Sequence, residues 1–483
     1  MIFKLNNKKD VFDNHEDIAS KIKKIFESDC FLNFFSNLSR KNGIPNSEIS
    51  FFFSKKLFLS FSCKKKSFNK KVNIYFGFLG ILIFPLYIIF VYIKRQRKKI
   101  IENNFNLIID NVNSERDMEI FHKLENFFED GVAYNLNQNF NCKIKNKKTI
   151  YHKKFNNYIL DLGSVFQYLS FFFPILILCV KYRINFFYIY INFMDNCFYY
   201  KAFFQKNKCK HMITYQHYNT NNIKNFFLNE IGGKYAIIQK NLNQLNETGF
   251  FYHSDICFTL SEKFSLGTAR YAIIKKKIPM GSFFMEYYFH ENKSENINDY
   301  EDYDILCIGG NEQYPGGRYD ISFNHASDYV EQLNWLKDLS VKFPDLKIGY
   351  KNHTNNLDKF ERNFFKNTSI NFLDQNLNSY FCCLKSKLIL SWGSTMIIEM
   401  RSLKKNSFYL NPNNRNMQLL NELSENDNDI NIQSYKNFET VVNNLFYKKS
   451  NTTYNSDKKN NYHCYESLNY SENVYKFLKN YES

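Results

Sequence analysis

Residues 388–412 predict a strand, a tight turn, a helix and a second strand, and this order constrains the fold more than any other feature. Leu388–Leu390 is a short apolar run, as in a buried strand. Gly393 supplies the conformational freedom that a tight turn requires, and Ser394 stands where a helix N-cap belongs. We therefore expect a helix that begins at Thr395 and belongs to an α/β domain.

The turn before this helix is a candidate phosphate site. The first backbone N–H groups of a helix have no intrahelical partner, and the helix dipole is positive at that end. The turn Gly393–Thr395 would therefore offer amides to a phosphate group. Glu399 follows a little over one helical turn later, where a carboxylate could reach ribose hydroxyls. The alternative is an ordinary capped helix, since a fold does not by itself specify a function.

Strands and helices alternate along most of the chain, which is typical of parallel α/β sheets. Phe105–Asp110 reads as a buried strand, and Met118–Phe128 as the amphipathic helix after it. Residues 289–303 are polar and acidic, as in an interdomain linker. We predict an α/β fold with two Rossmann-like domains. The expected regions are an N-terminal region at 1–100, a first Rossmann-like domain at 101–290, a second at 291–447 and a polar tail at 448–483.

Polar clusters follow two predicted strands of the first domain. Asn185–Phe193 reads as one of these strands, ends at Asp195 and precedes a predicted helix at Cys197–Phe204. Lys210–Tyr215 is the other, and it leads into a cluster that contains His217. Doubly wound sheets bind ligands at the carboxyl ends of their strands, so His217 is a candidate general base. The alternative is a hydrogen-bonded structural histidine.

Two basic clusters of the second domain are candidate anion sites. The predicted strand Leu346–Tyr350 leads into Lys351, Asn352 and His353, and a lysine beside a histidine suits a phosphate. Arg318 follows glycine pairs at 309–310 and 316–317, where backbone can approach a diphosphate and a guanidinium can pair with it. A solvated loop is the alternative in both places.

The run 72–93 is the strongest membrane signal in the chain. It is apolar apart from Asn73 and several tyrosines, and a basic cluster at 94–99 follows it at once. A run of roughly 20 apolar residues crosses a bilayer. Pro85 and the basic residues on both flanks leave a span, an anchor lying in one leaflet and a buried core helix open. Val165–Val180 is apolar but shorter, so we expect a membrane-proximal or core helix there.

Charge and cysteine content narrow the function classes. The eleven cysteines form no CxxC pair and have an odd total, which argues against a disulfide framework or a zinc site and favours a reducing cytosol. The formal charge of +17 could attract nucleic acid, anionic lipid or phosphorylated substrates. No nucleic-acid-reading motif is recognisable, so we expect no nucleic-acid partner.

From about Phe105 to Tyr447 the chain resembles the GT-B transferases that build bacterial surface polysaccharides, especially the capsule and teichoic-acid class related to CDP-glycerol glycerophosphotransferases. Lys351-Asn352-His353 looks like their Lys-x-His at a strand end. Ser394 to Glu399, followed by Pro412, is similar to their Ser-Ser-x-x-x-Asp element. Residues 216–220 resemble their Trp-His-Gly-Thr element, with tyrosine at 218 in place of glycine.

The resemblance implies a cytoplasm-facing, membrane-associated enzyme of capsule or cell-envelope synthesis that moves a sugar or polyol phosphate from a nucleotide-activated donor to a glycan or lipid-linked acceptor. The first domain would bind the acceptor and the second the donor, without a metal or other cofactor. The implied catalytic residues are His217 and His353, and the implied donor-binding residues are Lys351, Arg318, Gly393, Ser394, Thr395 and Glu399. A non-catalytic, membrane-tethered assembly or export protein of the same fold is the alternative, and a nucleic-acid-binding protein is a third.

Overall fold

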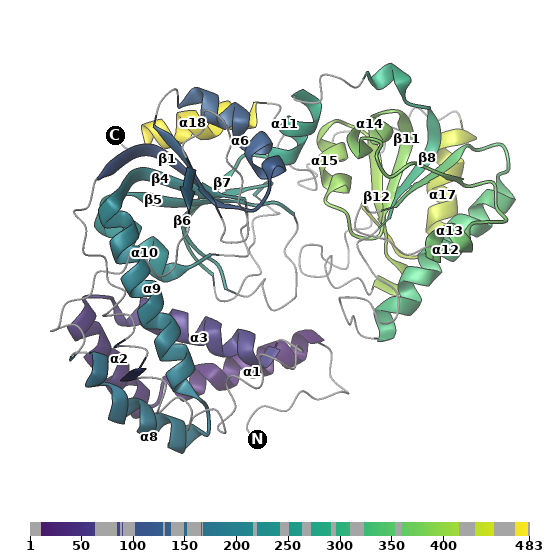
Figure 1. Cartoon of the computed structure of the whole chain (residues 1–483). Coiled ribbons are helices and arrows are strands. Elements are labelled where there is room, and N and C mark those ends of the chain that lie inside the picture. Colours follow the sequence, from purple (N-terminus) through teal and green to yellow (C-terminus); the bar gives the residue numbers. More distant parts are fainter. Residues whose placement is uncertain are drawn as a thin grey trace.

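The computed structural model describes two lobes, each built on a parallel sheet, with a unit of helices below the first lobe (Figure 1). The described residues are 11–62, 85–86, 89, 102–128, 131–136, 149–151, 166, 168–215, 220–241, 251–262, 272–290, 296–309, 323–352, 360–414, 430–448 and 469–481.

The first lobe contains a seven-stranded sheet whose neighbouring strands are all parallel. Its strands are β1 (Asn103–Val112), β2 (Val132–Leu136), β3 (Thr149–Tyr151), β4 (Asn207–Thr214), β5 (Lys234–Ile238), β6 (His253–Thr259) and β7 (Ile273–Pro279). Their spatial order is β3-β2-β1-β4-β5-β6-β7, so the chain first builds outward from β1 and then returns to add β4 on the other side. This places a switch point between β1 and β4, as in a doubly wound fold.

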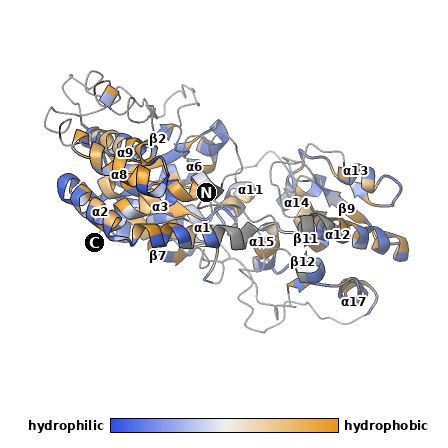
Figure 2. Cartoon of the chain, turned by 90° about the horizontal axis from the view of Figure 1, so that it is seen from below, coloured by the Kyte–Doolittle hydropathy of each residue, from blue (hydrophilic) through white to orange (hydrophobic). Residues whose placement is uncertain are grey.

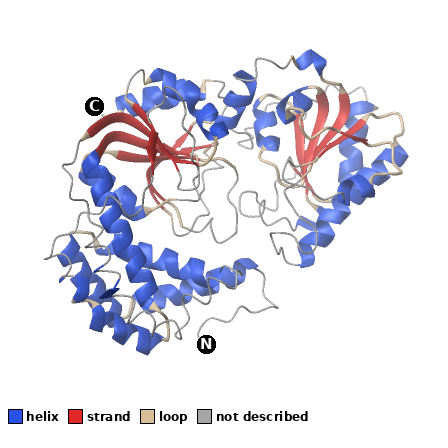
Figure 3. Cartoon of the chain, in the orientation of Figure 1, coloured by secondary structure: helices blue, strands red, loops and turns tan. Residues whose placement is uncertain are grey.

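The second lobe repeats this order in a six-stranded parallel sheet, β10-β9-β8-β11-β12-β13. Its strands are β8 (Tyr303–Ile308), β9 (Ile348–Lys351), β10 (Asn371–Phe372), β11 (Ser386–Ser391), β12 (Asn406–Leu410) and β13 (Asn431–Ile432). The switch point lies between β8 and β11. The prediction of two Rossmann-like domains is confirmed, and red strands flanked by blue helices show both (Figure 3).

Helices cover both faces of the first sheet because its strands carry apolar side chains alternately to each face. On β1, Leu107 and Ile109 face α6 (Glu115–Phe127) and α18 (Tyr470–Asn480), whereas Ile108 faces the opposite cluster. That cluster includes α9 (Phe186–Lys206) and α10 (Asn222–Glu230). The polar tail predicted at 448–483 thus contains a helix that returns to the first lobe, which its amphipathic spacing could have revealed.

A helical unit lies below the first lobe (Figure 1). It consists of α1 (Val11–Phe26), α2 (Asp29–Asn42), α3 (Asn46–Ser62), α8 (Phe172–Tyr182) and the first half of α9. Its core is aromatic: Phe31, Phe34, Phe35 and Phe53 are buried and meet mostly edge to face at 5.4–6.3 Å. The N-terminal region predicted at 1–100 is therefore in part a structural layer of the first lobe.

Polar contacts fix α3 to the first sheet. Glu48 accepts from the Asn222 amide and pairs with His253 Nε2 at 3.0 Å. Lys55 Nζ donates to the backbone carbonyls of Thr220, at 2.7 Å, and Phe251, at 3.1 Å. These buried or half-buried contacts satisfy groups that would otherwise be desolvated without partners, so they set the docking angle of α3.

The strand predicted at Asn185–Phe193 is wrong, because α9 is one helix that continues through Cys197–Phe204 to Lys206. The Asn185 side chain caps it by accepting from Tyr188 N. Its aromatic and β-branched residues have a spacing that is typical of a strand. Most of them are buried between the sheet and the helical unit. Burial on nearly all sides overrides the strand propensity of such residues.

The second lobe carries its helices on both faces of the sheet (Figure 1). They are α12 (Phe323–Lys342), α13 (Phe360–Phe364), α14 (Ser379–Leu384), α15 (Met396–Ser402) and α17 (Tyr435–Phe446), with short 3-10 turns η3 (Ile297–Asp299) and η4 (Pro412–Asn414). The helix α11 (Phe283–His290) leads from the first lobe into the second.

Within the described ranges, no helix combines the length and the apolar character that a bilayer span requires. Most of the run 72–93 lies outside these ranges; Pro85, Leu86 and Ile89 are the described residues in it. The anchor at 72–93 therefore stays a prediction.

Candidate functional site

The candidate site begins at the carboxyl edge of the second sheet, where backbone pairing aligns the residues singled out from the sequence. Ile308 on β8 pairs with Lys351 on β9 and with Ser391 on β11. Lys351 therefore lies level with the start of the Gly393 turn, on the other side of the switch point. Open α/β sheets bind ligands at the switch point, because the connections after the two adjacent strands run to opposite faces of the sheet and leave a crevice between them.

After β11, serine hydroxyl oxygens accept hydrogen bonds from backbone amides of the turn and of the start of the helix. Ser391 Oγ accepts from the amides of Gly393, at 3.4 Å, and Ser394, at 3.1 Å, and Ser394 Oγ accepts from Met396 N at 3.3 Å. The helix α15 begins at Met396, one residue later than predicted. The turn is partly exposed, so a phosphate would replace hydroxyl oxygens as the acceptor of these amides. Phosphate binding by Gly393, Ser394 and Thr395 stays a prediction.

Lys351 is buried at the end of β9. Its Nζ donates to the carbonyl oxygens of Asp374, at 2.8 Å, and Gln375, at 3.2 Å, which follow β10. Burial lowers the pKa of this lysine. In this arrangement Lys351 holds the loop after β10 against the strand edge, and a direct contact with donor phosphates stays a prediction.

Asn352 is a candidate that the sequence did not single out. It is buried directly after β9, and no described residue donates to its side-chain oxygen Oδ1. A buried acceptor without a donor costs roughly 1–3 kcal/mol, which a ligand hydroxyl or amino group would recover. The signal in the sequence is its place between Lys351 and His353, at a strand end that the pattern does predict.

Gly309 lets the end of β8 lie close to β9. We expect Gly309→Ala to destabilise the second lobe by about 1–3 kcal/mol, because the added methyl group would be too close to its neighbours. A Cβ there would lie 2.9 Å from the Tyr350 hydroxyl and 3.3 Å from the Lys351 carbonyl oxygen. Urea unfolding of the full chain measures the loss. Tyr350→Phe in the same chain removes the hydroxyl and should restore part of it; equal destabilisation with and without Tyr350→Phe would show that the clash lies elsewhere.

Glu399 lies at the junction of the lobes rather than on an open surface. Its buried carboxylate accepts from the Ser282 hydroxyl, just before α11, and from Tyr380 Oη at 3.0 Å. Burial raises the pKa of Glu399 to about 7, and these two hydrogen bonds offset only part of the effect. Its predicted contact with ribose hydroxyls remains untested, but the carboxylate already has two protein donors.

The helix α11 ties the lobes together on this side. Glu286 of α11 pairs with Lys123 of α6 at 2.8 Å and accepts from the Ser471 backbone and hydroxyl. Toward the second lobe, Tyr288 stacks on Tyr380 with ring centroids 5.0 Å apart. The helix α15 thus packs against the connector and lies on the side of the first lobe (Figure 1).

The first lobe presents its own polar groups at its switch point. The Tyr215 hydroxyl, directly after β4, donates to the Asp117 carboxylate in the first turn of α6. Asp117 also accepts from Asn113 N, after β1, at 2.7 Å. Residues 216–219, which include His217, follow Tyr215 in the sequence and lie outside the described residues. The side chains of His217, His353 and Arg318 lie outside the described residues, and their roles stay predictions.

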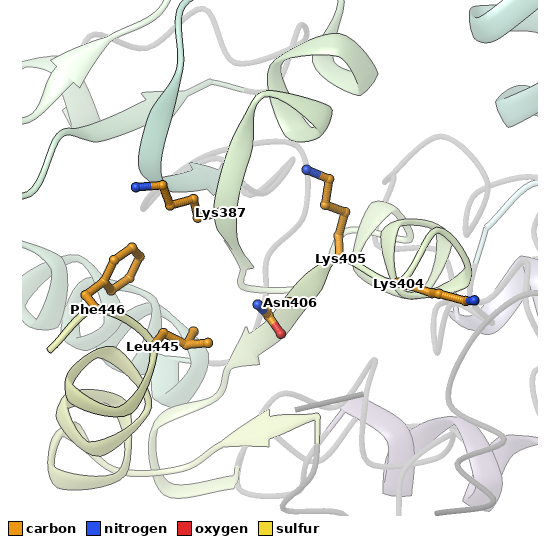
Figure 4. Close-up of a pocket in the computed structure, with 6 residues that line it drawn as sticks. All are labelled: Lys387, Lys404, Lys405, Asn406, Leu445 and Phe446. Atoms are coloured by element: carbon orange, nitrogen blue, oxygen red, sulfur yellow. The ribbon is translucent and has the colours of Figure 1, made fainter. Parts of the chain in front are cut away.

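A hollow of about 340 Å³ lies at the opposite, amino edge of the second sheet (Figure 4). Its lining residues are Lys387, Lys404, Lys405, Asn406, Leu445 and Phe446. Lys387 pairs with Asp304 at 2.8 Å, and Lys405 Nζ donates to the Leu384 and Ser386 carbonyls. Lys404 points away from the other two lysines (Figure 4). These ammonium groups do not converge, so the hollow does not compete with the carboxyl edge as a phosphate site.

No family model and no curated protein sequence matches the chain. The chain is similar to several solved structures. The UDP-GlcNAc 2-epimerase of Methanocaldococcus jannaschii is 13% identical over 78% of this chain and 100% of its own, with a TM-score of 0.43. That of Neisseria meningitidis, bound to UDP-GlcNAc, is 11% identical over 77% and 100%, with a TM-score of 0.44. The wall teichoic acid polymerase TagF is 9% identical over 93% and 97%, with a TM-score of 0.40. Identity at this level transfers no residue and no substrate to this chain.

Among the described residues, no group of three His, Cys, Asp or Glu side chains is arranged to hold a metal ion. Metal-independent action stays an expectation.

Proposed function

We propose that this chain is a membrane-associated transferase that moves a sugar or polyol phosphate from a nucleotide-activated donor to a glycan or lipid-linked acceptor of a surface polysaccharide. The observation that carries the proposal is the pair of doubly wound sheets, one per lobe, joined so that α15 lies on the side of the first lobe and its Glu399 accepts a hydrogen bond from Ser282, just before α11. Two ligand-binding edges in two lobes suit a reaction with two substrates, because each lobe can hold one of them.

The chemistry assigns a task to each lobe. A nucleotide diphosphate leaves more readily when its charge is stabilised, and the turn Gly393–Thr395 together with Lys351, His353 and Arg318 would supply amides and cations for this. An acceptor hydroxyl must lose its proton as it attacks, and His217, after β4 of the first lobe, is the base that we assign. Closure of the lobes would exclude water and so favour transfer over hydrolysis.

A second candidate is a non-catalytic assembly or export protein of the same fold. Tyr218 favours it, since a bulky residue beside His217 changes the backbone freedom that a glycine would give. A radiolabelled transfer assay separates the two: labelled product supports the enzyme, whereas nucleotide binding without any product supports the assembly protein.

Ser394→Asp is expected to weaken nucleoside diphosphate binding at least about tenfold, because the new carboxylate would lie beside the donor phosphates. Isothermal titration calorimetry with UDP, CDP and GDP measures the change. The control is Ser434→Asp: Ser434 is the partly exposed N-cap of α17, beyond β13 and two strands from β11. Aspartate is also a favourable N-cap, so this variant should fold and bind as the parent does. Unchanged affinity in Ser394→Asp would remove the donor site from this turn.

A further inference from the structure

The helix α8 exposes an apolar face. Phe173, Ile177 and Val180 are 70%, 62% and 68% exposed, and their spacing places them on one side of the helix together with exposed Pro174. Outward positions of a helix in water normally carry polar residues, but Phe172–Val180 contains none. Scattered single exposures are ordinary, whereas a continuous stripe marks an interaction surface.

Contacts along its length hold α8 in place, with the stripe turned outward. At its C-terminal end, Lys181 Nζ lies 2.9 Å from Cys30 Sγ and Tyr182 packs against Phe31, both near the start of α2. At its N-terminal end, Lys41 near the end of α2 donates to Ser170 at 2.6 Å. The two helices therefore run antiparallel, at the outer edge of the helical unit (Figure 1). Ile175, Leu178 and Cys179 form the buried side, so the apolar stripe cannot turn inward without breaking this packing.

Positive charge flanks the stripe at both ends. Lys181 and Arg183 follow it and are exposed, and Lys41 lies beside its start. No acidic residue occurs between Asp161 and Asp195. In a symmetric pairing of two copies through this face, cations at both ends would repel one another. An anionic surface would complement them, and an apolar helix face between basic residues is typical of helices that lie in a membrane interface.

We propose that the apolar face of α8 inserts into the interface of an anionic lipid bilayer, with Lys181 and Arg183 at the level of the lipid phosphates. This contact is separate from the anchor predicted at 72–93, where exposed Leu86 and Ile89 point to further apolar surface. It requires no transfer activity, so its test does not depend on the proposed function. The helical unit would rest on the membrane and hold the first lobe near a lipid-linked acceptor.

The test uses Ile177→Trp in the full chain, because the native Trp335 and Trp392 are both buried in the second lobe. Vesicles of phosphatidylcholine and phosphatidylglycerol should shift the added emission to shorter wavelength, and acyl-brominated lipids should quench it. Vesicles of phosphatidylcholine alone should do so less. The matched control is Val341→Trp, since Val341 on α12 is 73% exposed in the other lobe and should give no lipid-dependent change.

A second variant tests the charges in the Ile177→Trp chain. Lys181→Glu with Arg183→Glu should raise the vesicle concentration for half-maximal quenching at least about tenfold. Lys476→Glu with Lys479→Glu on α18 makes the same net-charge change away from α8 and should have a smaller effect. Unquenched Ile177→Trp emission overturns the proposal. Emission that is already shifted to shorter wavelength without lipid also overturns it. A shift that depends on protein concentration would indicate that a second copy covers this face, and a shift that does not would indicate that another part of the same chain covers it.

Discussion

Lys224→Met is expected to destabilise the chain by about 3–5 kcal/mol, because it leaves the Asp110 carboxylate buried without a counter-charge. Both side chains are almost fully inaccessible, and Lys224 Nζ donates directly to Asp110 Oδ2. Asp110 also accepts from Asn135, at 2.7 Å, and from the Tyr235 hydroxyl, at 3.0 Å. These neutral donors remain in the variant, but they cannot balance a full negative charge in a medium that solvates it poorly.

Urea unfolding of the full chain, followed by circular dichroism, measures this loss. The control is Lys208→Met, which removes the same charge from an exposed pair with Glu102, 2.8 Å away; Lys208 lies near the amino end of β4, the strand beside β1. Exposed pairs contribute about 0–1 kcal/mol, so this variant should unfold close to the parent. If both variants lost the same stability, the Asp110 pair would have no special role in holding the first lobe together.

The pH dependence of Lys224→Met gives an independent check. Burial would raise the pKa of Asp110, but Lys224 and the neighbouring hydrogen bonds outweigh it and hold the pKa below the ordinary 3.8. A lowered pKa means that this pair stabilises the parent above pH 3.8, and that the contribution is lost as the pH falls through the folded-state pKa. The stability gap between parent and variant should therefore narrow in acid. A gap that stayed constant would mean that packing, rather than charge, is lost.

Asp110 also shows how far the sequence could predict the site. The apolar run of β1 correctly indicates a strand, since period and strand length are local properties, and that strand lies beside the switch point of the sheet. The strand continues to Val112, however, and the Asp110 side chain turns to the face covered by α10. Its partner Lys224 comes 114 residues later, and no local pattern pairs residues at that separation.

The same limit applies to the helices. The sequence at 388–412 predicts the order strand, turn, helix and strand correctly, because the turn glycine and the apolar spacing act within a few positions; the N-cap, however, is Thr395 rather than Ser394. In contrast, the residue pattern within α9 predicts a strand, and 448–483 is predicted as a polar tail, although α18 packs against the first lobe. In both cases the deciding contacts are made with distant parts of the chain, which supply the burial that overrides local propensity.

Glu399→Gln is expected to change the pH profile of stability more than any other substitution at the junction of the lobes. Burial raises the pKa of Glu399 from 4.5 to about 7, so the folded chain holds this proton more tightly than the unfolded chain. The resulting stabilisation is fully present below pH 4.5 and is lost as the pH rises through about 7, a difference of about 3 kcal/mol. Glutamine keeps the shape of the protonated acid and cannot ionise, so Glu399→Gln should lack this decline.

Urea unfolding at pH 5 and pH 8 compares the free energies of unfolding of the parent and the Glu399→Gln variant. These should be similar at pH 5, and the variant should be the more stable at pH 8. Glu472→Gln, which changes an exposed side chain of α18, is the control and should follow the parent at both values. The same samples decide between two roles of Glu399. A residue that joins α15 to Ser282 and Tyr380 should alter stability while leaving nucleotide affinity unchanged at pH 5. A loss of affinity at pH 5 would instead mean that the carboxyl also contacts the ligand, as the spacing from Ser394 predicts.

A parallel decline in the stability of parent and variant between pH 5 and 8 would show that Glu399 does not titrate in this range, and that the junction tolerates its charge.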